Sequence, residues 1–347
     1  MYFGSDNCGP AHPAVMQALS DANQGYHASY GDDPIMDRVR TKIRTLFEAP
    51  EAAVYLVATG TAANTLGLAT LTQPWQTIFC TPDAHIQVDE CNGPEFFTGG
   101  AKLTLVGDGD KMTPEALEKA IAKWPKGDVH AAQHGPLCLT QVTERGQVYT
   151  LDELRALTAI AHAHDLPSFM DGARFANAIA TLGCTPAEMT WKSGVTALSM
   201  GGTKNGCIGV EAVIFFDPAH AWEFELRRKR AAHLFSKHRY LSAQMDAYLT
   251  DNLWRDIATQ SNAACAHLVA GLKTLPDCHF THDPQANMIF ATLPRATHQR
   301  LHAAGAAYSM FDGPVDSGDP AQPLLCRLVT DWSITTDQID AFIAAAT

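Results

Sequence analysis

Several common signals are absent from this chain. No stretch of roughly 18 apolar residues appears, so we expect no membrane-spanning helix. The N-terminus lacks a basic segment followed by an apolar one, which would mark a secretion signal. The nine cysteines are scattered, odd in number and never spaced as CxxC, which indicates reduced thiols rather than a disulfide framework or a zinc site. These absences predict a soluble, cytoplasmic protein.

Basic residues are also in the minority. The chain has 25 Lys and Arg against 37 Asp and Glu, a net charge of −12, which argues against a nucleic-acid partner. An anionic small ligand is still possible, because helix N-termini and a few local cations suffice to bind one. With 347 residues, 46% hydrophobic and only 18% charged, the chain can bury a sizeable core in one large domain or two ordinary ones.

Short apolar runs alternate with helical patterns through the first two thirds of the chain. We predict strands at residues 53–57, 77–80, 102–106, 137–141, 167–170, 195–200 and 211–216, and helices at 60–71, 86–90, 113–123, 151–164 and 174–182. Strands separated by helices indicate an α/β fold with a mostly parallel sheet covered on both faces. Ligands bind at the carboxyl ends of the strands in such sheets.

The flanking segments differ from this pattern. Helices are expected at residues 13–22 and 33–46, and long ones at 221–237 and 240–272. From residue 279 onward we expect a smaller α+β unit, with strands at 288–293 and 324–330 and helices at 298–304 and 336–345. The predicted organisation is a large α/β domain with an N-terminal arm over residues 1–240, and a small C-terminal α+β domain over residues 241–347.

Two strand ends carry an unusual pair of residues. Lys204 follows an apolar run and lies in the glycine-rich turn 201–206, while Asp171 ends an earlier apolar run. A pyridoxal 5'-phosphate (PLP) site needs such a pair, because the Lys forms the Schiff base and the Asp keeps the pyridine nitrogen protonated. Each has a plainer interpretation as well: Lys204 as a solvated surface group, and Asp171 as a helix cap or the ion-pair partner of Arg174.

Three further positions suit the same chemistry. Gly60 opens a run of small residues at a predicted strand-to-helix turn, where backbone N–H groups can bind a phosphate, although most such glycines are structural. His85 could stack on a flat cofactor ring, or could be a helix-start histidine with a backbone partner. Arg327 lies inside an apolar strand and needs an anionic partner, either a substrate carboxylate or an internal salt bridge.

A metal site is not expected. His130 and His134 have the spacing of one helical face, but no HExxH glutamate lies between them and their segment has no clear helical pattern.

This set of residues resembles the low-specificity L-threonine aldolases, which are fold-type I PLP-dependent enzymes grouped with the β-eliminating lyase superfamily. The resemblance covers essentially the whole chain, and its motifs are Tyr30-Gly31-Asp32-Asp33, Gly60-Thr61-Ala62-Ala63-Asn64, Asp171-Gly172-Ala173-Arg174-Phe175, Gly183-Cys184-Thr185-Pro186-Ala187-Glu188 and Gly201-Gly202-Thr203-Lys204-Asn205-Gly206. The Asp171 and Lys204 motifs are specific, whereas the glycine turn is not.

The resemblance implies a role for each matching residue. Lys204 matches the Schiff-base lysine, Asp171 the acid on the pyridine nitrogen, and His85 the histidine stacked on the ring. Gly60 and Thr61 match the residues that bind the phosphate, and Arg174 matches a residue near the PLP hydroxyl and the substrate carboxylate. Ser5 and Arg327 match residues that bind the substrate carboxylate, and Tyr30 matches a residue on the substrate side of the site.

The resemblance also implies PLP-dependent cleavage of L-threonine, L-allo-threonine or a related β-hydroxy-α-amino acid such as phenylserine to glycine and an aldehyde. The alternative is a β-eliminating lyase or an aminotransferase of the same fold. A homotetramer built from dimers is implied, with sites completed across the dimer interface. One residue of the cluster Lys229, Arg230, Lys237 and Arg239 would then supply a cation to the neighbour's phosphate.

The chain departs from the family pattern at one place. Many members have a Glu-Asn-Thr-His stretch, whose His assists with the substrate hydroxyl. The comparable residues here, 139–144, read Leu-Thr-Gln-Val-Thr-Glu and include no histidine. The group that takes the hydroxyl proton, and with it the stereochemical preference at Cβ, is therefore open; His85, or a water that it holds, is one candidate.

Overall fold

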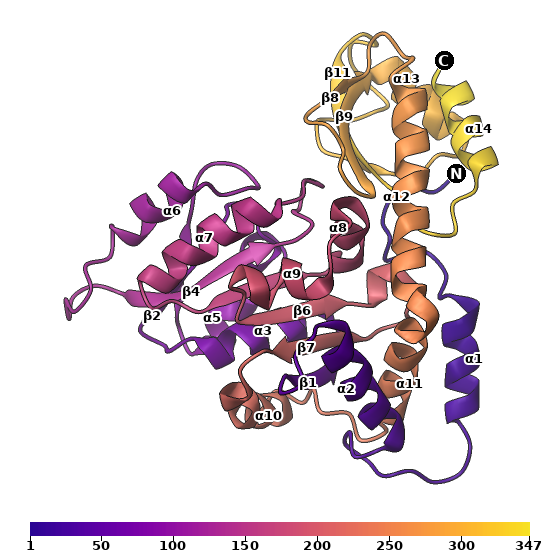
Figure 1. The fold of residues 1–347 in the computed structure, drawn as a ribbon. Helices are drawn as coiled ribbons and strands as arrows, with labels where there is room; N and C mark the ends of the chain where they lie inside the picture. Colours follow the sequence, from indigo (N-terminus) through magenta and orange to yellow (C-terminus); the bar gives the residue numbers. More distant parts are fainter.

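The computed structural model describes all residues, 1–347, and contains two β-sheets. The larger has seven strands in the order β1-β7-β6-β5-β4-β2-β3 (Figure 1). Its strands are β1 (Ala53–Val57), β2 (Gln76–Cys80), β3 (Lys102–Leu105), β4 (Gln133–Thr140), β5 (Ser168–Gly172), β6 (Ala197–Gly201) and β7 (Glu211–Phe215). Strands β3, β2, β4, β5 and β6 run parallel, whereas β7 is antiparallel to both β6 and β1. The predicted α/β fold and mostly parallel sheet are confirmed.

Helices cover both faces of this sheet because the strands bury side chains on both. Along β1, Val54 and Leu56 belong to one apolar core, and Ala53, Tyr55 and Val57 to another, as alternation along a strand requires. The first core includes residues of α2 (Pro34–Leu46), α6 (Pro114–Ile121), α7 (Leu151–Ala163), α8 (Phe175–Leu182) and α9 (Pro186–Met189). The second includes residues of α3 (Gly60–Leu71), α4 (His85–Val88) and α10 (Ala221–Arg230).

The helix starts follow local capping rules. Thr59 accepts a hydrogen bond from Ala62 N at the start of α3, and Thr150 forms a reciprocal capping box with Glu153 at the start of α7. None of the helices combines the length and the apolar character needed to cross a bilayer.

The smaller sheet is antiparallel, in the order β10-β11-β9-β8. It comprises β8 (His279–Phe280), β9 (Met288–Pro294), β10 (Ser309–Met310) and β11 (Pro323–Val329), and its core includes residues of α13 (Arg295–Ala303) and α14 (Thr336–Ala346). The chain's N-terminus joins this unit: Phe3 is fully buried in its core, and Tyr2 bridges to Ala307. Figure 1 accordingly shows the N-terminus beside the C-terminal helix.

One long helix, α12 (Leu253–Leu272), connects the two sheets. α1 (Pro13–Ala22) packs beside α11 (Arg239–Tyr248), and α12 runs from there to the small sheet (Figure 1). On α12, Trp254 and Ala258 belong to a core of the large sheet, and Cys265 and Leu268 to the core of the small sheet.

The predicted long helices were wrong in extent. The helix expected over 221–237 ends at Arg230, because Ala232 adopts a left-handed conformation with φ of 63°. The helix expected over 240–272 is two helices, separated at Asp251 and Asn252 with φ of 50° and 62°, values at which a helix cannot continue. Short α5 (Gly93–Thr98), β8 and β10 were not predicted, since runs this short carry little periodic signal.

Candidate active site

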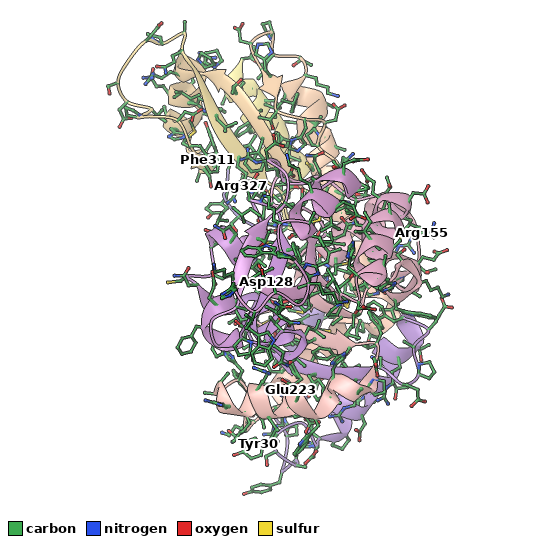
Figure 2. All side chains as sticks on the ribbon, turned by 90° about the vertical axis from the view of Figure 1, so that its left-hand side faces the viewer. Tyr30, Asp128, Arg155, Glu223, Phe311 and Arg327 are labelled. Atoms are coloured by element: carbon green, nitrogen blue, oxygen red, sulfur yellow. The ribbon has the colours of Figure 1, made fainter.

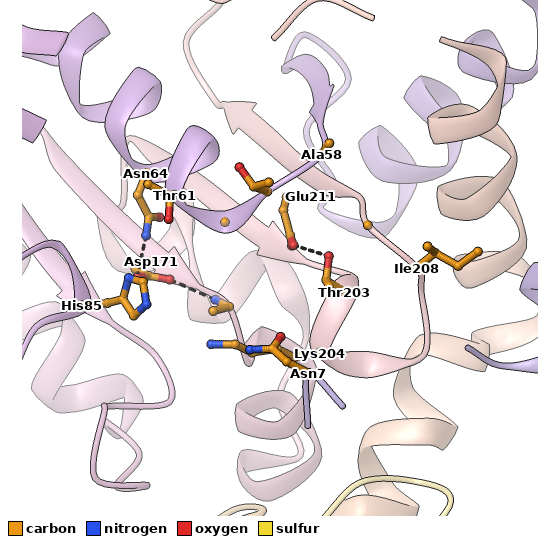
Figure 3. Close-up of a pocket in the computed structure, with 14 residues that line it drawn as sticks. Asn7, Ala58, Thr61, Asn64, His85, Asp171, Thr203, Lys204, Ile208 and Glu211 are labelled. Carbon is orange, nitrogen blue, oxygen red and sulfur yellow. Dashed lines mark hydrogen bonds between the residues drawn. The ribbon is translucent and has the colours of Figure 1, made fainter. Parts of the chain in front are cut away.

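A cavity of about 380 Å³ brings together five of the predicted site residues. Gly60 and Thr61 from the start of α3, His85 from the start of α4, Asp171 from the end of β5, and Lys204 all line its wall (Figure 3). Their convergence follows from the parallel sheet, because the carboxyl ends of its strands meet at one edge. Asn7 of the N-terminal arm also lines the cavity.

Four predicted residues lie outside this cavity. Arg174 is buried behind the wall, where its Nε and Nη2 donate to Asp6 at 2.7 and 3.0 Å. Ser5 accepts a hydrogen bond from Asn7 N at 3.1 Å. Arg327 lines a neighbouring cavity. Tyr30 is 46% exposed and lies at the bottom of the molecule in Figure 2, far from Arg327.

Asp171 is held by neutral donors. Asn64 Nδ2 donates to its Oδ2 at 2.8 Å, and the Ala173 N–H donates to its Oδ1 at 3.0 Å. The carboxylate is buried and has no cationic partner, because Arg174 pairs with Asp6 instead. The ion pair between Asp171 and Arg174 considered from the sequence does not form. Asp171 therefore offers its charge to the cavity rather than to another side chain.

The Lys204 side chain is half-buried and forms neither a hydrogen bond nor an ion pair with the protein. The turn that carries it is tightly held. Asn205 Nδ2 donates to Tyr248 Oη and to Trp254 O, both at 2.7 Å, and Tyr248 Oη donates to Gly201 O at 3.1 Å. Gly206 ends the turn with φ of 91°, where a side chain would be strained. A fixed backbone and an unpaired amine suit a nucleophilic lysine.

His85 is linked to Asp171 through two intermediate groups. His85 Nδ1 lies 2.8 Å from Glu90 Oε1, which also accepts a hydrogen bond from Asn64 Nδ2 at 2.9 Å. The Glu90 contact raises the pKa of His85 against the effect of burial, and Asp171 and Glu144 add to the rise. The partner of the ring is thus a carboxylate, not the backbone group considered from the sequence.

The start of α3 offers an open anion site. Gly60 is the first residue of this 12-residue helix, and a side chain built there would meet nothing within 4 Å. Thr61 and the turn residue Thr203 line the same part of the cavity. Unpaired N–H groups and the positive end of the helix dipole favour a phosphate at such a position.

Glu211 is a buried carboxyl group beside this anion site. Thr203 Oγ1 donates to its Oε1 at 2.5 Å, and the Gly202 N–H donates to its Oε2 at 2.9 Å. No cation pairs with it, and burial raises the pKa of Glu211 to about 7.

A second cavity of about 340 Å³ lies between the large and small sheets and contains Arg327. Arg327 Nη2 donates only long hydrogen bonds, to Gly4 O at 3.3 Å and Ser309 Oγ at 3.4 Å, and its buried Nε has no partner. Burial lowers the pKa of Arg327, and repulsion from Arg174 adds to this. Because no internal salt bridge forms, the guanidinium is available to an external anion.

Sequence reasoning did not single out Asn64, Glu90, Glu144 or Glu211. Asn64 offered a signal, since it is the one amide side chain in a helix of small and apolar residues. From the sequence, Glu211 is only the first residue of a predicted strand. Glu144 is only the last residue of the stretch 139–144, which lacks the family's histidine.

Comparisons with known proteins agree with this geometry. The beta-eliminating lyase family matches residues 3–305. Low-specificity L-threonine aldolases from Pseudomonas sp. (strain NCIMB 10558) and Pseudomonas aeruginosa are 39% and 40% identical over 313 residues, covering 90% of this chain and 89% of each relative.

Solved structures show the same fold. Leishmania major threonine aldolase superposes with a TM-score of 0.90 at 24% identity, covering 99% of this chain and 98% of that one. A serine palmitoyltransferase from S. paucimobilis with bound PLP gives a TM-score of 0.71 at 18% identity, with coverages of 99% and 87%. The expected family resemblance and the fold-type I architecture are thereby confirmed. The chain belongs to the β-eliminating lyase family, and the relatives that it matches over nine tenths of its length are low-specificity L-threonine aldolases.

Proposed function

We propose that this protein is a PLP-dependent aldolase that cleaves L-threonine, L-allo-threonine or a related β-hydroxy-α-amino acid, phenylserine included, to glycine and an aldehyde. The observation that carries the proposal is an unpaired Lys204 in one cavity with an uncompensated, buried Asp171 carboxylate. This pair occurs in a chain that is about 40% identical to L-threonine aldolases over nine tenths of its length.

The residues around the cavity fit PLP. Lys204 would hold it covalently, and Asp171 would hold the proton on its ring nitrogen. His85 would lie on the ring face, and the open N-terminus of α3 at Gly60 and Thr61 would bind the phosphate. When bound, the cofactor supplies an electron sink for the pair released from a bond at the substrate Cα.

The chain's own residues would select which bond breaks. Arg327, with its unpaired Nε, would bind the substrate carboxylate, and Ser5 would assist from the N-terminal arm. Holding the carboxylate would set the orientation of Cα and so select which of its bonds is cleaved. Arg174 would contribute indirectly, because its hydrogen bonds to Asp6 hold the N-terminal arm in place.

Product analysis tests this function. The PLP-loaded protein is incubated with L-threonine, L-allo-threonine and L-phenylserine, and glycine, aldehyde and 2-oxo acid are measured. Equimolar glycine and aldehyde are expected. Formation of a 2-oxo acid in their place would assign the protein to elimination or transamination on the same fold.

We further propose that the enzyme is a homotetramer of dimers whose sites are completed by a second copy. Tyr30 lies away from the cavity in its own chain, with Lys229 Nζ 4.9 Å from its ring centroid. Exposed apolar side chains, including Phe96, Trp222 and Leu226, lie on the adjoining α5 and α10. A second copy placed there would bring Tyr30 and one cation of the cluster Lys229, Arg230, Lys237 and Arg239 to its neighbour's phosphate.

Mixed dimers test this arrangement. Tyr30→Ala and Lys204→Ala chains are each expected to be nearly inactive, yet a mixture refolded together forms heterodimers with one intact site. Regained cleavage supports the shared site, whereas no gain over the separate variants contradicts it.

A further inference from the structure

The second cavity contains a carboxylate with no partner. Glu144 lines this cavity together with Arg327, and its carboxylate receives no hydrogen bond and forms no ion pair. The remaining walls include Phe290 and Phe311 from the small domain (Figure 2 shows Phe311 beside Arg327). A carboxylate that is free, half-buried and next to the proposed carboxylate binder is placed to meet a substrate rather than to stabilise the fold.

The turn that carries Glu144 is rigid. Thr143 Oγ1 and Gln147 Nε2 donate to the two carboxylate oxygens of Asp110 at 2.5 and 2.7 Å. Within the turn, the Thr143 N–H donates to Gln147 O at 2.9 Å and the Gly146 N–H donates to Thr143 O at 3.0 Å. Gly146 has φ of 85°, and a side chain there would lie 3.0 Å from Met288 O, so the turn packs directly on the small sheet. A side chain on such a turn keeps its position during a reaction.

Glu144 also lies within electrostatic range of the first cavity. Burial raises the pKa of Glu144, and the opposing charges of Arg174 and Lys204 act to lower it, with Asp171 and His85 contributing less. The charged groups that share its cavity are Asp83, Asp89, Arg145 and Arg327, of which Arg145 pairs with Asp83 at 2.8 Å. Glu144 therefore shares a cavity with the group proposed to hold the substrate carboxylate, and the charges of the groups proposed to hold the cofactor act on it.

We propose that Glu144 is a catalytic residue that takes the proton from the β-hydroxyl of the substrate. The O–H bond breaks and its proton passes to a Glu144 oxygen. Its electron pair would form the aldehyde C=O as the Cα–Cβ bond breaks, and the cofactor would supply the electron sink for the pair of that bond. A proton from solvent would then be added at Cα to give glycine, and Glu144 would lose its proton to solvent. This assignment rests on the proposed aldolase function.

His85 is the less suitable base. The Glu90 contact raises the pKa of His85, so a larger share of the ring carries both protons near neutral pH and has no free lone pair. The pKa of Glu144 is raised as well, but from the low value of a carboxyl group, and a carboxylate whose pKa is raised is a stronger base than an ordinary one. His85 is also committed at Nδ1 to Glu90.

The test separates loss of the base from general damage to the site. Glu144→Gln is compared with wild type for cleavage of L-threonine and for solvent deuterium exchange at Cα of glycine, which has no hydroxyl. We expect kcat for cleavage to fall by about 10²-fold or more, while glycine exchange stays within about two-fold. Glu144→Asp should recover part of the cleavage rate. Glu188→Gln, at a half-buried carboxyl on α9 outside both cavities, is the matched control and should match wild type in both assays.

Two readouts do not depend on turnover. The visible absorption of bound PLP should be the same in Glu144→Gln and wild type. In the cofactor-free protein, wild type should lose stability relative to Glu144→Gln as pH rises through the raised pKa of Glu144, because the folded protein holds this proton more tightly.

Several results would overturn the assignment. They are cleavage by Glu144→Gln at near wild-type rate, a parallel loss of cleavage and glycine exchange, or an identical pH dependence of stability in the two proteins. If wild type itself releases no aldehyde from any β-hydroxy amino acid, the proposed function fails as well, which the wild-type assay reveals before any variant is made.

Discussion

Asn64 fixes the position of Asp171: its Nδ2 atom lies 2.8 Å from Oδ2 of the carboxylate (Figure 3). The same Nδ2 atom donates to Glu90 Oε1 at 2.9 Å. Its own Oδ1 accepts a hydrogen bond from Ser199 Oγ at 2.8 Å, which fixes the direction of the amide. One neutral side chain thus separates two buried carboxylates and holds both in place.

Replacing Asn64 should therefore reduce stability and activity together. Asn64→Ala leaves Asp171 Oδ2 without a donor and removes one of the two contacts to Glu90 Oε1, and we expect the free energy of unfolding to fall by about 1–3 kcal/mol in urea titrations. The rate of cleavage should fall as well, because Asp171 is no longer held. Asn262→Ala, which removes an amide bonded to Asn177 away from the cavity, is the matched control and should lower stability alone. Unchanged activity in Asn64→Ala would argue against the positioning role.

Arg327 should govern substrate affinity. Arg327→Ala removes a half-buried guanidinium with an unpaired Nε, and the loss of charge-assisted hydrogen bonds, worth about 1.5–3 kcal/mol, predicts a KM for L-threonine raised by roughly 10–100-fold. Arg327→Lys should recover little, because Lys lacks the planar fork. Steady-state kinetics measure both values. Arg300→Ala, which removes a contact to Ala346 O in the same domain, should leave KM unchanged.

The buried ion pair between Asp6 and Arg174 should stabilise the fold in a pH-dependent way. Burial acts to raise the pKa of Asp6, but Arg174 and Lys204 outweigh it and the pKa of Asp6 is lowered. This stabilisation is present above the ordinary carboxyl pKa and is lost as pH falls through the lowered one. Asp6→Ala leaves a buried, unpaired Arg174, and we expect about 3–5 kcal/mol less stability at pH 7. A loss below about 1 kcal/mol in denaturant titrations would contradict a buried pair.

The contribution of Glu211 to stability should change with pH in the direction opposite to that of Asp6. Its pKa is about 7 in the folded protein against 4.5 as the ordinary value. The folded protein therefore holds the proton more tightly, and stability falls as pH rises between these two values, by an amount on the order of 3 kcal/mol. Glu211→Gln can still accept from the Gly202 N–H and can donate to Thr203 Oγ1 in place of accepting from it, and it should flatten the melting temperature across this window. A slope equal to that of wild type would show that Glu211 titrates normally.

The parts of the site that could be predicted are those encoded locally. Gly60, Asp171 and Lys204 each follow an apolar strand, and the parallel sheet places such strand ends at one edge. Partners distant in the chain could not be predicted in this way. Asp6 lies 168 residues from Arg174, and the plainer prediction for Arg174 was the nearby Asp171.

The helix boundaries show the same limit. The break between α11 and α12 depends on left-handed conformations at Asp251 and Asn252, which single residues outside glycine adopt only where tertiary contacts allow. Glu144 had no sequence signal as a base, because its significance arises from Arg327 in the other domain and from the absence of any partner.

The most direct test of the proposed active site is to identify the lysine that binds the cofactor. The PLP-loaded protein is reduced with borohydride, digested, and its peptides are analysed by mass spectrometry. The structure predicts one modified residue, Lys204, and no modification in Lys204→Ala, which should also show no cleavage. Modification at a different lysine, or full cleavage activity in Lys204→Ala, would contradict the assignment of this cavity as the catalytic site.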